Sequence, residues 1–339
     1  MAQHEISGPF MFNKDTIEKN MWNVALALIP AALVSVFFFG YYAVYLILSP
    51  ALTAVLIDMI FTGQSFPGDG SAFVTGMLLG FSIPANSPWW LPLLGSGLAI
   101  IVGKQLFGGL GNNVFNPALV GRAIIRISFA GLFAEWPAPF TGITAATPLA
   151  ERVEPVSLSF FNIEGSYELW ELFIGNIPGA VGETSAAALL LGAVFLYFKG
   201  YIGWRITGGY ILSAAVFGMF LGLNPLFTIF SGALILGSCF MATDMVTSPS
   251  TKDGRLIFGI GCGILTIVMR EFTEFSGGVT FAILAMNGAS YLLDNLFEGP
   301  RMGQLKQRET LYNRLLSILF FVFIFILLTW TAIKLQSLF

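Results

Sequence analysis

The sequence has 339 residues, of which 56% are hydrophobic and only 10% are charged, against roughly 25% charged residues in an ordinary soluble domain. With a mean hydropathy of +0.80, this composition excludes a set of soluble domains and predicts a polytopic membrane protein in a lipid bilayer. The 2 cysteines and the single histidine exclude a four-cysteine iron–sulfur cluster, a bis-histidine haem or a Ser-His-Asp hydrolase within the chain, and the net charge of −3 gives no indication of nucleic-acid binding.

Residues 1–20 are mixed and polar, so we expect no cleavable signal peptide there. Because a helix needs ~20 apolar residues to cross the hydrocarbon, the chain predicts five spans in its first half, at 21–39, 41–60, 72–83, 89–102 and 114–133. A polar loop at 134–184 precedes five more, at 185–198, 204–221, 226–242, 256–269 and 279–297. A last apolar run at 314–333 completes a single membrane domain covering 1–339.

Glycine and proline interrupt matching spans in the two halves. Pro84, Pro88 and Gly103 flank the third and fourth spans, and Gly232 and Gly259 break the eighth and ninth. Short, interrupted spans in matched positions are typical of inverted-repeat transport folds. The predicted fold is therefore all-α, with inverted repeats of five transmembrane helices at 21–133 and 185–297 plus a C-terminal helix; the alternative is that glycine is simply common in membrane helices.

The basic residues predict the orientation of the spans. With the N-terminus in the cytoplasm, the outer side holds only Arg152, Arg270 and Lys334, while Arg122 and Arg126 lie inside the fifth span. All the other lysines and arginines then face the cytoplasm, as positively charged loops usually do. This orientation places the loop at 134–184 outside the cytoplasm.

That loop contains the run Thr141-Gly-Ile-Thr-Ala-Ala-Thr-Pro, rich in small residues and hydroxyls. Small residues let a planar ligand approach the backbone. A flexible loop or a threonine-capped helix start explains the same run.

Four sequence blocks, at 69–80, 102–122, 240–249 and 257–263, resemble one membrane family in content and order. They read DGSAFVTGMLLG, VGKQLFGGLGNNVFNPALVGR, FMATDMVTSP and IFGIGCG. The pattern is similar to the D subunit of the Rnf complex, the ion-translocating ferredoxin:NAD oxidoreductase of prokaryotic inner membranes. That subunit is homologous to the B subunit of the sodium-pumping NADH:quinone oxidoreductase.

The resemblance implies a covalent flavin on the outer loop. In the family, FMN is joined through its phosphate to a threonine by an exported flavin transferase, and the matching residue here is Thr147. Thr144 and Ala146 match the attachment pattern, whereas Thr141 stands where the family usually has an acidic residue. The resemblance also implies a second, noncovalent riboflavin between the two halves.

Polar residues inside the predicted spans need partners. Arg122 and Arg126 are spaced i, i+4 and so share a helix face; one of them could approach the flavin phosphate, or both could pair with a buried carboxylate or a neighbouring subunit. Asp58 could belong to an ion pathway or sit in water at the end of its helix.

Two further polar clusters coincide with family blocks. Thr243 and Asp244 could coordinate a cation or contact a flavin ring, or they could form a turn before Pro249. Asn116, with Lys104 nearby, could bind phosphate or a ring edge, although a polar turn explains it equally well. We expect no metal site and no catalytic residue in the chain itself.

The sequence therefore predicts an electron-transfer subunit of a redox-driven translocase in the prokaryotic inner membrane, carrying FMN and coupling electron flow to Na⁺ or H⁺ transport. Its implied partners are the other membrane and peripheral Rnf subunits, including a second flavin-carrying subunit and iron–sulfur subunits. The alternatives are the B subunit of the sodium-pumping quinone reductase and a redox-inactive inverted-repeat channel or transporter.

Overall fold

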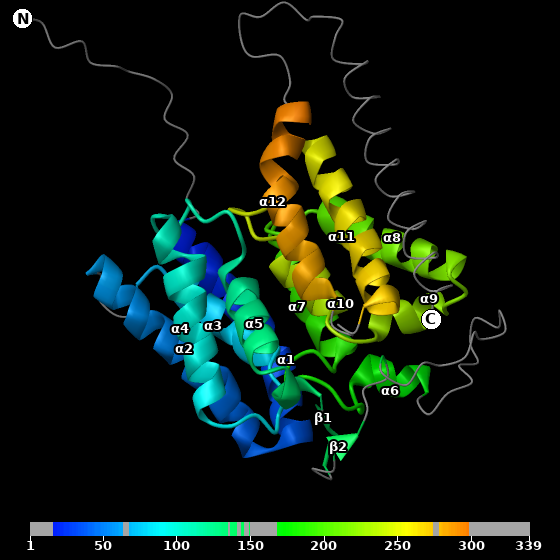
Figure 1. The fold of residues 1–339 in the computed structure, drawn as a ribbon, viewed down its shortest axis with the longest axis horizontal. Coiled ribbons are helices and arrows are strands. Elements are labelled where there is room, and N and C mark those ends of the chain that lie inside the picture. The colour runs from blue at the N-terminus through cyan, green and yellow to red at the C-terminus, as the bar shows by residue number, and fades with distance from the viewer. Residues whose placement is uncertain are drawn as a thin grey trace, which may run out of the picture.

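Helices running side by side dominate the computed structural model, which describes residues 16–63, 68–134, 136–140, 144–145, 149, 168–273 and 278–297. Figure 1 shows two groups of helices, with a small hairpin at one end of the molecule. We call this end the hairpin end. The predicted C-terminal helix at 314–333 lies outside the described residues.

The first group, drawn in blue to teal, contains the helices of the first half of the chain. It comprises α1 (Ile17–Phe39), α2 (Tyr41–Thr62), α3 (Ser71–Phe81), α4 (Trp90–Gly103), the 3-10 turn η1 (Gln105–Phe107), α5 (Pro117–Ser128) and the 3-10 turn η2 (Ala130–Phe133).

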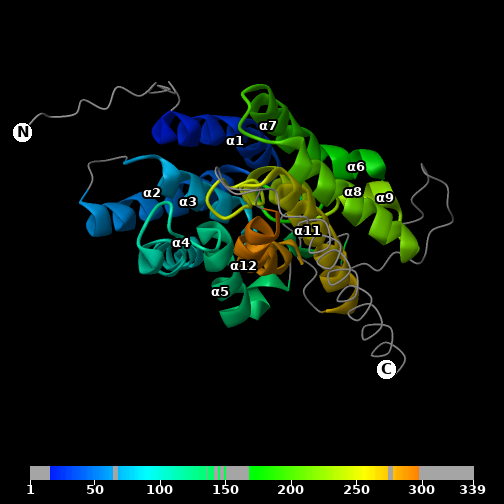
Figure 2. The same cartoon turned by 90° about the horizontal axis from the view of Figure 1, so that it is seen from above.

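The second group, drawn in green to orange, contains the helices that follow the hairpin. The connecting segment holds β1 (Trp136–Pro137), β2 (Thr144–Ala145) and α6 (Leu169–Ile174). The group itself comprises α7 (Ala186–Phe198), α8 (Trp204–Phe220), α9 (Pro225–Phe230), α10 (Leu234–Leu236), the π-helical turn η3 (Gly237–Met241), α11 (Lys252–Phe272) and α12 (Val279–Phe297). Figure 2 shows the two groups meeting where α1 packs on α7 and α5 packs on α12.

Each of the ten predicted spans within the described residues contains helix, but the helices differ in length. Among the described residues, three stretches are long and apolar enough to cross a membrane: Ile17–Phe39, Tyr41–Thr62 and Trp90–Phe107. Ser71–Phe81 and Ala186–Phe198 are apolar but shorter. α11 is longer than its predicted span because Thr251 caps it, accepting a hydrogen bond from the amide of Gly254 at 3.3 Å.

Two spans that we predicted as continuous helices are divided into shorter elements in the structure. The span at 114–133 is α5 followed by a 3-10 turn, and α5 starts at Pro117 because the Asn116 side chain accepts hydrogen bonds from the amides of the first turn. The span at 226–242 is divided into α9, α10 and η3. Gly232, at φ 63°, takes the left-handed conformation that separates α9 from α10.

The third helix of the first group is also interrupted inside the molecule. α3 ends at Phe81, and after a turn the chain pairs with residues 180–182 through the isolated bridge of Pro84 with Ala180. Val181 donates its amide hydrogen to the carbonyl of Ile83 at 3.0 Å, and Gly182 donates to Phe81 at 2.8 Å. Because these backbone groups are paired within the protein, the break can lie deep in the bundle.

Besides the isolated bridge of Pro84 with Ala180, the hairpin is the departure from an all-α fold in the described part of the chain. Trp136 pairs with Ala145 and Pro137 pairs with Thr144 in antiparallel register. Composition did not predict these two-residue strands, since so short a pairing depends on what the loop packs against. The loop at 134–184, which we call the Thr-rich loop, is fixed near its start at this end of the bundle by the hairpin.

Candidate functional site

Two buried groups of polar residues lie at opposite ends of the bundle. One lies at the hairpin end, around Arg122 and Arg126. The other lies at the opposite end, where α1, α3 and α5 begin and α4 and α7 finish. The two groups contain every described residue that the sequence singled out as a candidate.

Arg122 is held by a carboxylate at the hairpin end. Its guanidinium forms an ion pair and hydrogen bond with Glu183, and both side chains are buried. Glu183 lies in the turn just before α7, far from Arg122 in sequence. The Nε of Arg122 has no hydrogen-bond partner within the described residues. Of the two interpretations of Arg122, the structure therefore shows the pair with a buried carboxylate.

Arg126, one turn further along α5, has a different environment. It is only 7% exposed, and its guanidinium carbon lies 5.6 Å from the centre of the Phe133 ring. Within the described residues, no carboxylate reaches Arg126 in an ion pair. Glu183 is the carboxylate that acts on Arg126, but it is already paired with Arg122. A buried cation without an ion-pair partner of its own is costly, so Arg126 can take an anionic ligand or partner.

Arg126 is linked to the Thr-rich loop through aromatic rings. Phe133, under its guanidinium, contacts Trp136 with the ring centroids 6.2 Å apart. Trp136 is paired with Ala145 in the hairpin. This chain of contacts brings the buried cation to the strand that carries Thr144, whose backbone alone is described. Ala146 and Thr147 lie outside the described residues.

A second contact fixes the other side of the same loop. A Cβ atom added to Gly232 would lie 2.7 Å from Cδ1 of Leu149 and 3.4 Å from Nη2 of Arg270. Leu149 therefore packs into the break between α9 and α10. Arg270 supports that break by donating to the carbonyls of Thr228 and Ser231 at 3.1 and 3.0 Å. In sequence, Thr147 falls between the two anchors Ala145 and Leu149.

A pocket of about 100 Å³ lies at the opposite end of the bundle. Its lining includes both predicted residues Thr243 and Asp244 as well as Asn116, together with Lys104, Asn113 and Ser71. Asn113 is 5% exposed, and its Oδ1 has no hydrogen-bond partner within the described residues. The tertiary structure thus assembles polar residues from blocks that are distant in sequence.

Hydrogen bonds in the turn after η3 occupy Thr243 and Asp244. The Thr243 hydroxyl donates to the carbonyl of Cys239 at 2.6 Å, and Asp244 accepts from the hydroxyl of Thr247 at 3.1 Å. Desolvation raises the pKa of the Asp244 carboxyl, while hydrogen bonds from Thr247 and Val246 oppose that rise. Asp244 thus forms the predicted turn and also faces the pocket.

Asn116 acts as a structural connector. Besides capping α5, its side-chain amide donates to the carbonyl of Met241 in η3 at 3.1 Å, and its backbone amide donates to Oδ1 of Asn287 on α12 at 3.2 Å. Asn287 in turn donates to the carbonyl of Thr247 at 3.1 Å. These bonds join α5 to the second group of helices and leave the Asn116 side chain with both of its polar atoms occupied.

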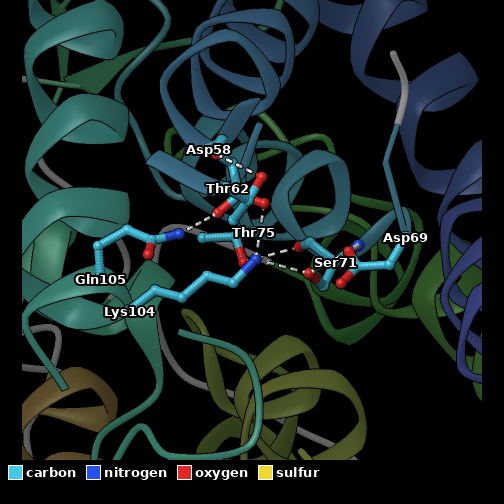
Figure 3. Close-up of polar contacts among 7 residues, drawn as sticks. All are labelled: Asp58, Thr62, Asp69, Ser71, Thr75, Lys104 and Gln105. Carbon is cyan, nitrogen blue, oxygen red and sulfur yellow. Dashed lines mark hydrogen bonds and ion pairs between the residues drawn. The ribbon is translucent and has the colours of Figure 1, made fainter. Parts of the chain in front are cut away.

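A buried ion pair between Lys104 and Asp58 lies beside the pocket, which Lys104 helps to line, and Figure 3 shows its contacts. Nζ of Lys104 lies 2.9 Å from Oδ2 of Asp58 and 2.9 Å from the hydroxyl of Ser71. Gln105 donates to the other oxygen of Asp58 at 2.6 Å, and Asp69 accepts from the Ser71 hydroxyl at 2.5 Å. Asp58 is 5% exposed, so the expectation that it sits in water at its helix end was wrong.

Sequence reasoning did not identify Glu183 or the pairing of Lys104 with Asp58. The sequence feature that could have pointed to these ion pairs is the presence of single charged residues in apolar segments, because each requires a partner of opposite sign. Which partner is used depends on how the helices pack. Among the described residues, no group of three His, Cys, Asp or Glu side chains is placed to hold a metal ion.

Comparison with known proteins gives consistent matches over most of the chain. A model of the NQR2, RnfD, RnfE family matches residues 5–303. The D subunit of the Na⁺-translocating ferredoxin:NAD⁺ oxidoreductase complex of Acetobacterium woodii is 39% identical over 298 residues, covering 85% of this chain and 91% of the relative.

Two further relatives agree. The D subunit of the proton-translocating ferredoxin:NAD⁺ oxidoreductase complex of Clostridium ljungdahlii is 35% identical over 315 residues, covering 88% of this chain and 95% of the relative. The D subunit of the ion-translocating oxidoreductase complex of Stutzerimonas stutzeri is 34% identical over 322 residues, covering 84% of this chain and 91% of the relative. Since both the family model and these relatives extend over most of its length, the chain belongs to the NQR2, RnfD, RnfE family.

Proposed function

We propose that this protein is the D subunit of an ion-translocating ferredoxin:NAD oxidoreductase in a prokaryotic inner membrane, and that it carries FMN joined through its phosphate to Thr147. The relatives named above are D subunits of such redox-driven translocases. When bound, FMN supplies a carrier that accepts and donates single electrons. The chain contributes the tether, the surrounding charge and the attachment to the rest of the complex.

The flavin proposal rests on the buried guanidinium of Arg126, which forms no ion pair with a carboxylate among the described residues. A phosphate ester is an anion, and an arginine in a site of low exposure binds phosphate strongly because its hydrogen bonds are charge-assisted. Arg126 contacts Phe133, and Phe133 contacts Trp136. Trp136 pairs with the hairpin strand that precedes Thr147. Arg122 is already neutralised by Glu183, so Arg126 is the better candidate for the flavin phosphate.

The two anchors of the loop support attachment at Thr147. Ala145 is paired in the hairpin, and Leu149 packs at Gly232. A residue between two fixed points has a restricted reach, which keeps a tethered ring close to the bundle. The proposal places this loop on the extracytoplasmic face, where an exported flavin transferase can reach it.

The predicted riboflavin does not fit the pocket at the opposite end as its walls stand. The pocket measures about 100 Å³, whereas ligand pockets usually have ~300 Å³ or more. Thr243 and Asp244 face this space, but a three-ring system needs its walls to move apart. The proposed electron path therefore includes no step through riboflavin in this pocket.

We propose that the transported ion is either Na⁺ or H⁺. The relative from Acetobacterium woodii is named for Na⁺ translocation and that from Clostridium ljungdahlii for proton translocation, at similar identities to this chain. We propose that the protein works together with the other membrane subunits, the second flavin-carrying subunit and the iron–sulfur subunits. The described residues provide no cluster of ligands for a metal ion, and electrons are proposed to enter and leave through those partners.

In-gel flavin fluorescence of the denatured protein, purified from its native complex, tests the attachment. Fluorescence is expected in the wild type and is expected to be lost in Thr147→Ala, because that change removes the hydroxyl that forms the ester. Thr144→Ala is the matched control, since it removes a neighbouring hydroxyl. Fluorescence that persists in Thr147→Ala would refute the assignment.

Arg126→Gln tests the role of the cation separately. This change keeps a polar side chain of similar length but removes the charge, so we expect a lower yield of attached flavin at an unchanged level of the protein. Arg255, at an exposed position near the start of α11, provides an Arg→Gln control. An unchanged yield in Arg126→Gln would show that the guanidinium serves another partner.

A further inference from the structure

A long apolar groove lies between α8 and α11 on the outer surface of the second group. Its volume is about 680 Å³, and its lining includes Trp204, Leu212, Val216 and Phe220 of α8 with Leu256 and Ile260 of α11. Leu212 and Phe220 are 67% and 81% exposed. Gly208 and Gly209 also line it and add no side-chain volume, so the groove is open along much of α8.

Two rows of residues spaced by four contribute to the lining, and such rows are inclined to the helix axis. On α8 the row Trp204, Gly208, Leu212, Val216, Phe220 advances four residues at a time, and on α11 the row is Leu256, Ile260, Ile264. Residues spaced by four lie on one helix face. Along α8 the 17 residues extend about 25 Å at 1.5 Å per residue, which is comparable with the ~30 Å hydrocarbon thickness of a bilayer.

Positive charge stands at one mouth of this groove. Arg205 lies four residues before Gly209 on the α8 face that lines the groove, and its guanidinium carbon is 5.1 Å from the centre of the Trp204 ring. Lys252 continues the α11 row one turn beyond Leu256 and is exposed. At the other mouth, the lining residues Phe220, Leu221 and Phe272 are all apolar.

Helix stability does not account for these two cations. Arg205 and Lys252 both stand in the first turn of their helices, where the helix dipole disfavours positive charge. The two cations stand level with each other, because a Cβ on Gly209 would lie 3.1 Å from the carbonyl of Leu256, and Arg205 and Lys252 each lie four residues before these two residues. Both charges are therefore placed to meet an anion held in front of the groove.

We propose that the α8–α11 groove binds an anionic phospholipid, with acyl chain along the two apolar rows and phosphate between Arg205 and Lys252. The charge count places both cations on the cytoplasmic side, where anionic lipids attract basic residues. Trp204 stands at the mouth, the depth at which tryptophan is enriched in membrane proteins. An apolar helix in the groove would leave both cations without an anion, which favours the lipid.

Lipid binding to the full-length chain in detergent tests this proposal. The probes are phosphatidylglycerol and the zwitterionic phosphatidylcholine, and native mass spectrometry measures the fraction of protein with bound lipid. We expect tighter binding of phosphatidylglycerol by the wild type. Arg205→Gln and Lys252→Gln are each expected to weaken it roughly fivefold, which follows from the usual attraction of one basic residue to anionic lipid, while phosphatidylcholine binding stays unchanged.

Lys199→Gln is the matched control, because Lys199 is an exposed lysine beyond the end of α7 whose Nζ lies 5.8 Å from the Phe195 ring centre, away from the groove lining. It is expected to bind phosphatidylglycerol like the wild type. Equal loss in the control and in Lys252→Gln, or equal affinity for the two lipids, would overturn the proposal.

The occupant can also be identified in the native complex. Leu212, in the middle of the groove, is replaced by photoreactive benzoylphenylalanine and irradiated in membranes. A cross-link to phospholipid is expected. A cross-link to another protein, or to residues 314–333 of this chain, would show that a helix covers the groove instead.

Discussion

At the scale of single residues, buried charge is the feature that organises both ends of the bundle. Arg122 pairs with Glu183, and Lys104 pairs with Asp58. Burying two charges costs several kcal/mol per ion, and good geometry with further hydrogen bonds is needed to offset that cost. The Asp58 pair has those bonds, from Gln105 and through Ser71.

Lys104→Met should destabilise the protein strongly. The change keeps side-chain length but leaves the Asp58 carboxylate buried without its cation, which typically costs about 3 to 5 kcal/mol. The measurement is thermal unfolding in detergent, followed by a thiol-reactive dye that reports exposure of the buried Cys239 and Cys262. We expect a clearly lower unfolding midpoint than in the wild type.

The double variant Asp58→Asn/Lys104→Met provides the control for this explanation. Removing both charges eliminates the unpaired carboxylate, so the double variant should unfold at a higher temperature than Lys104→Met alone. Lys199→Met, at an exposed position, should leave the midpoint nearly unchanged. If the double variant is no more stable than Lys104→Met, the loss comes from packing and the ion-pair account is wrong.

At the scale of secondary-structure elements, the helices approach each other through small residues. Gly76 on α3 faces the backbone of Ala51 and Pro50 on α2, and Gly263 on α11 faces the backbone of Tyr210 on α8. Such close approach suits helices in a membrane, where van der Waals packing takes the place of a hydrophobic driving force. Glycine in these helices is therefore a packing requirement as well as a source of breaks.

Gly76→Ala should separate α2 from α3. The added Cβ would overlap the backbone of Ala51 and Pro50, and overpacking of this kind typically costs about 1 to 3 kcal/mol. The same thiol-dye unfolding assay measures the loss. Gly131→Ala is the matched control, because a Cβ there meets no atom within 4 Å; a similar loss in both variants would contradict the packing explanation.

At the scale of the whole molecule, the two groups of helices contact each other through α1 with α7 and α5 with α12. In both groups the chain is interrupted at the third position, at the end of α3 and between α9 and η3. This correspondence supports the proposal of two inverted five-helix repeats. In that arrangement, the hairpin end lies outside the cytoplasm and the end with the Lys104 pocket lies inside.

Cysteine labelling in intact cells tests the orientation. Glu168→Cys, beside α6, and Lys199→Cys, after α7, are both at exposed positions on opposite sides of the proposed membrane. A membrane-impermeant maleimide is expected to label position 168 in intact cells and position 199 only after permeabilisation. The buried native cysteines provide the background, and the reverse pattern would invert the proposed topology.

The sequence by itself determined the membrane character, the family and the positions of most helices, because apolar runs and motif blocks are local properties of the chain. It also marked Arg122, Arg126, Asp58 and Asp244 as residues needing an explanation. Only the tertiary structure decided that Arg122 pairs with Glu183 while Arg126 has no ion pair within the described part of the chain, that Asp58 is buried, and that Asp244 faces a small pocket. Partners across the bundle are set by helix packing over long sequence separations, which no local pattern encodes.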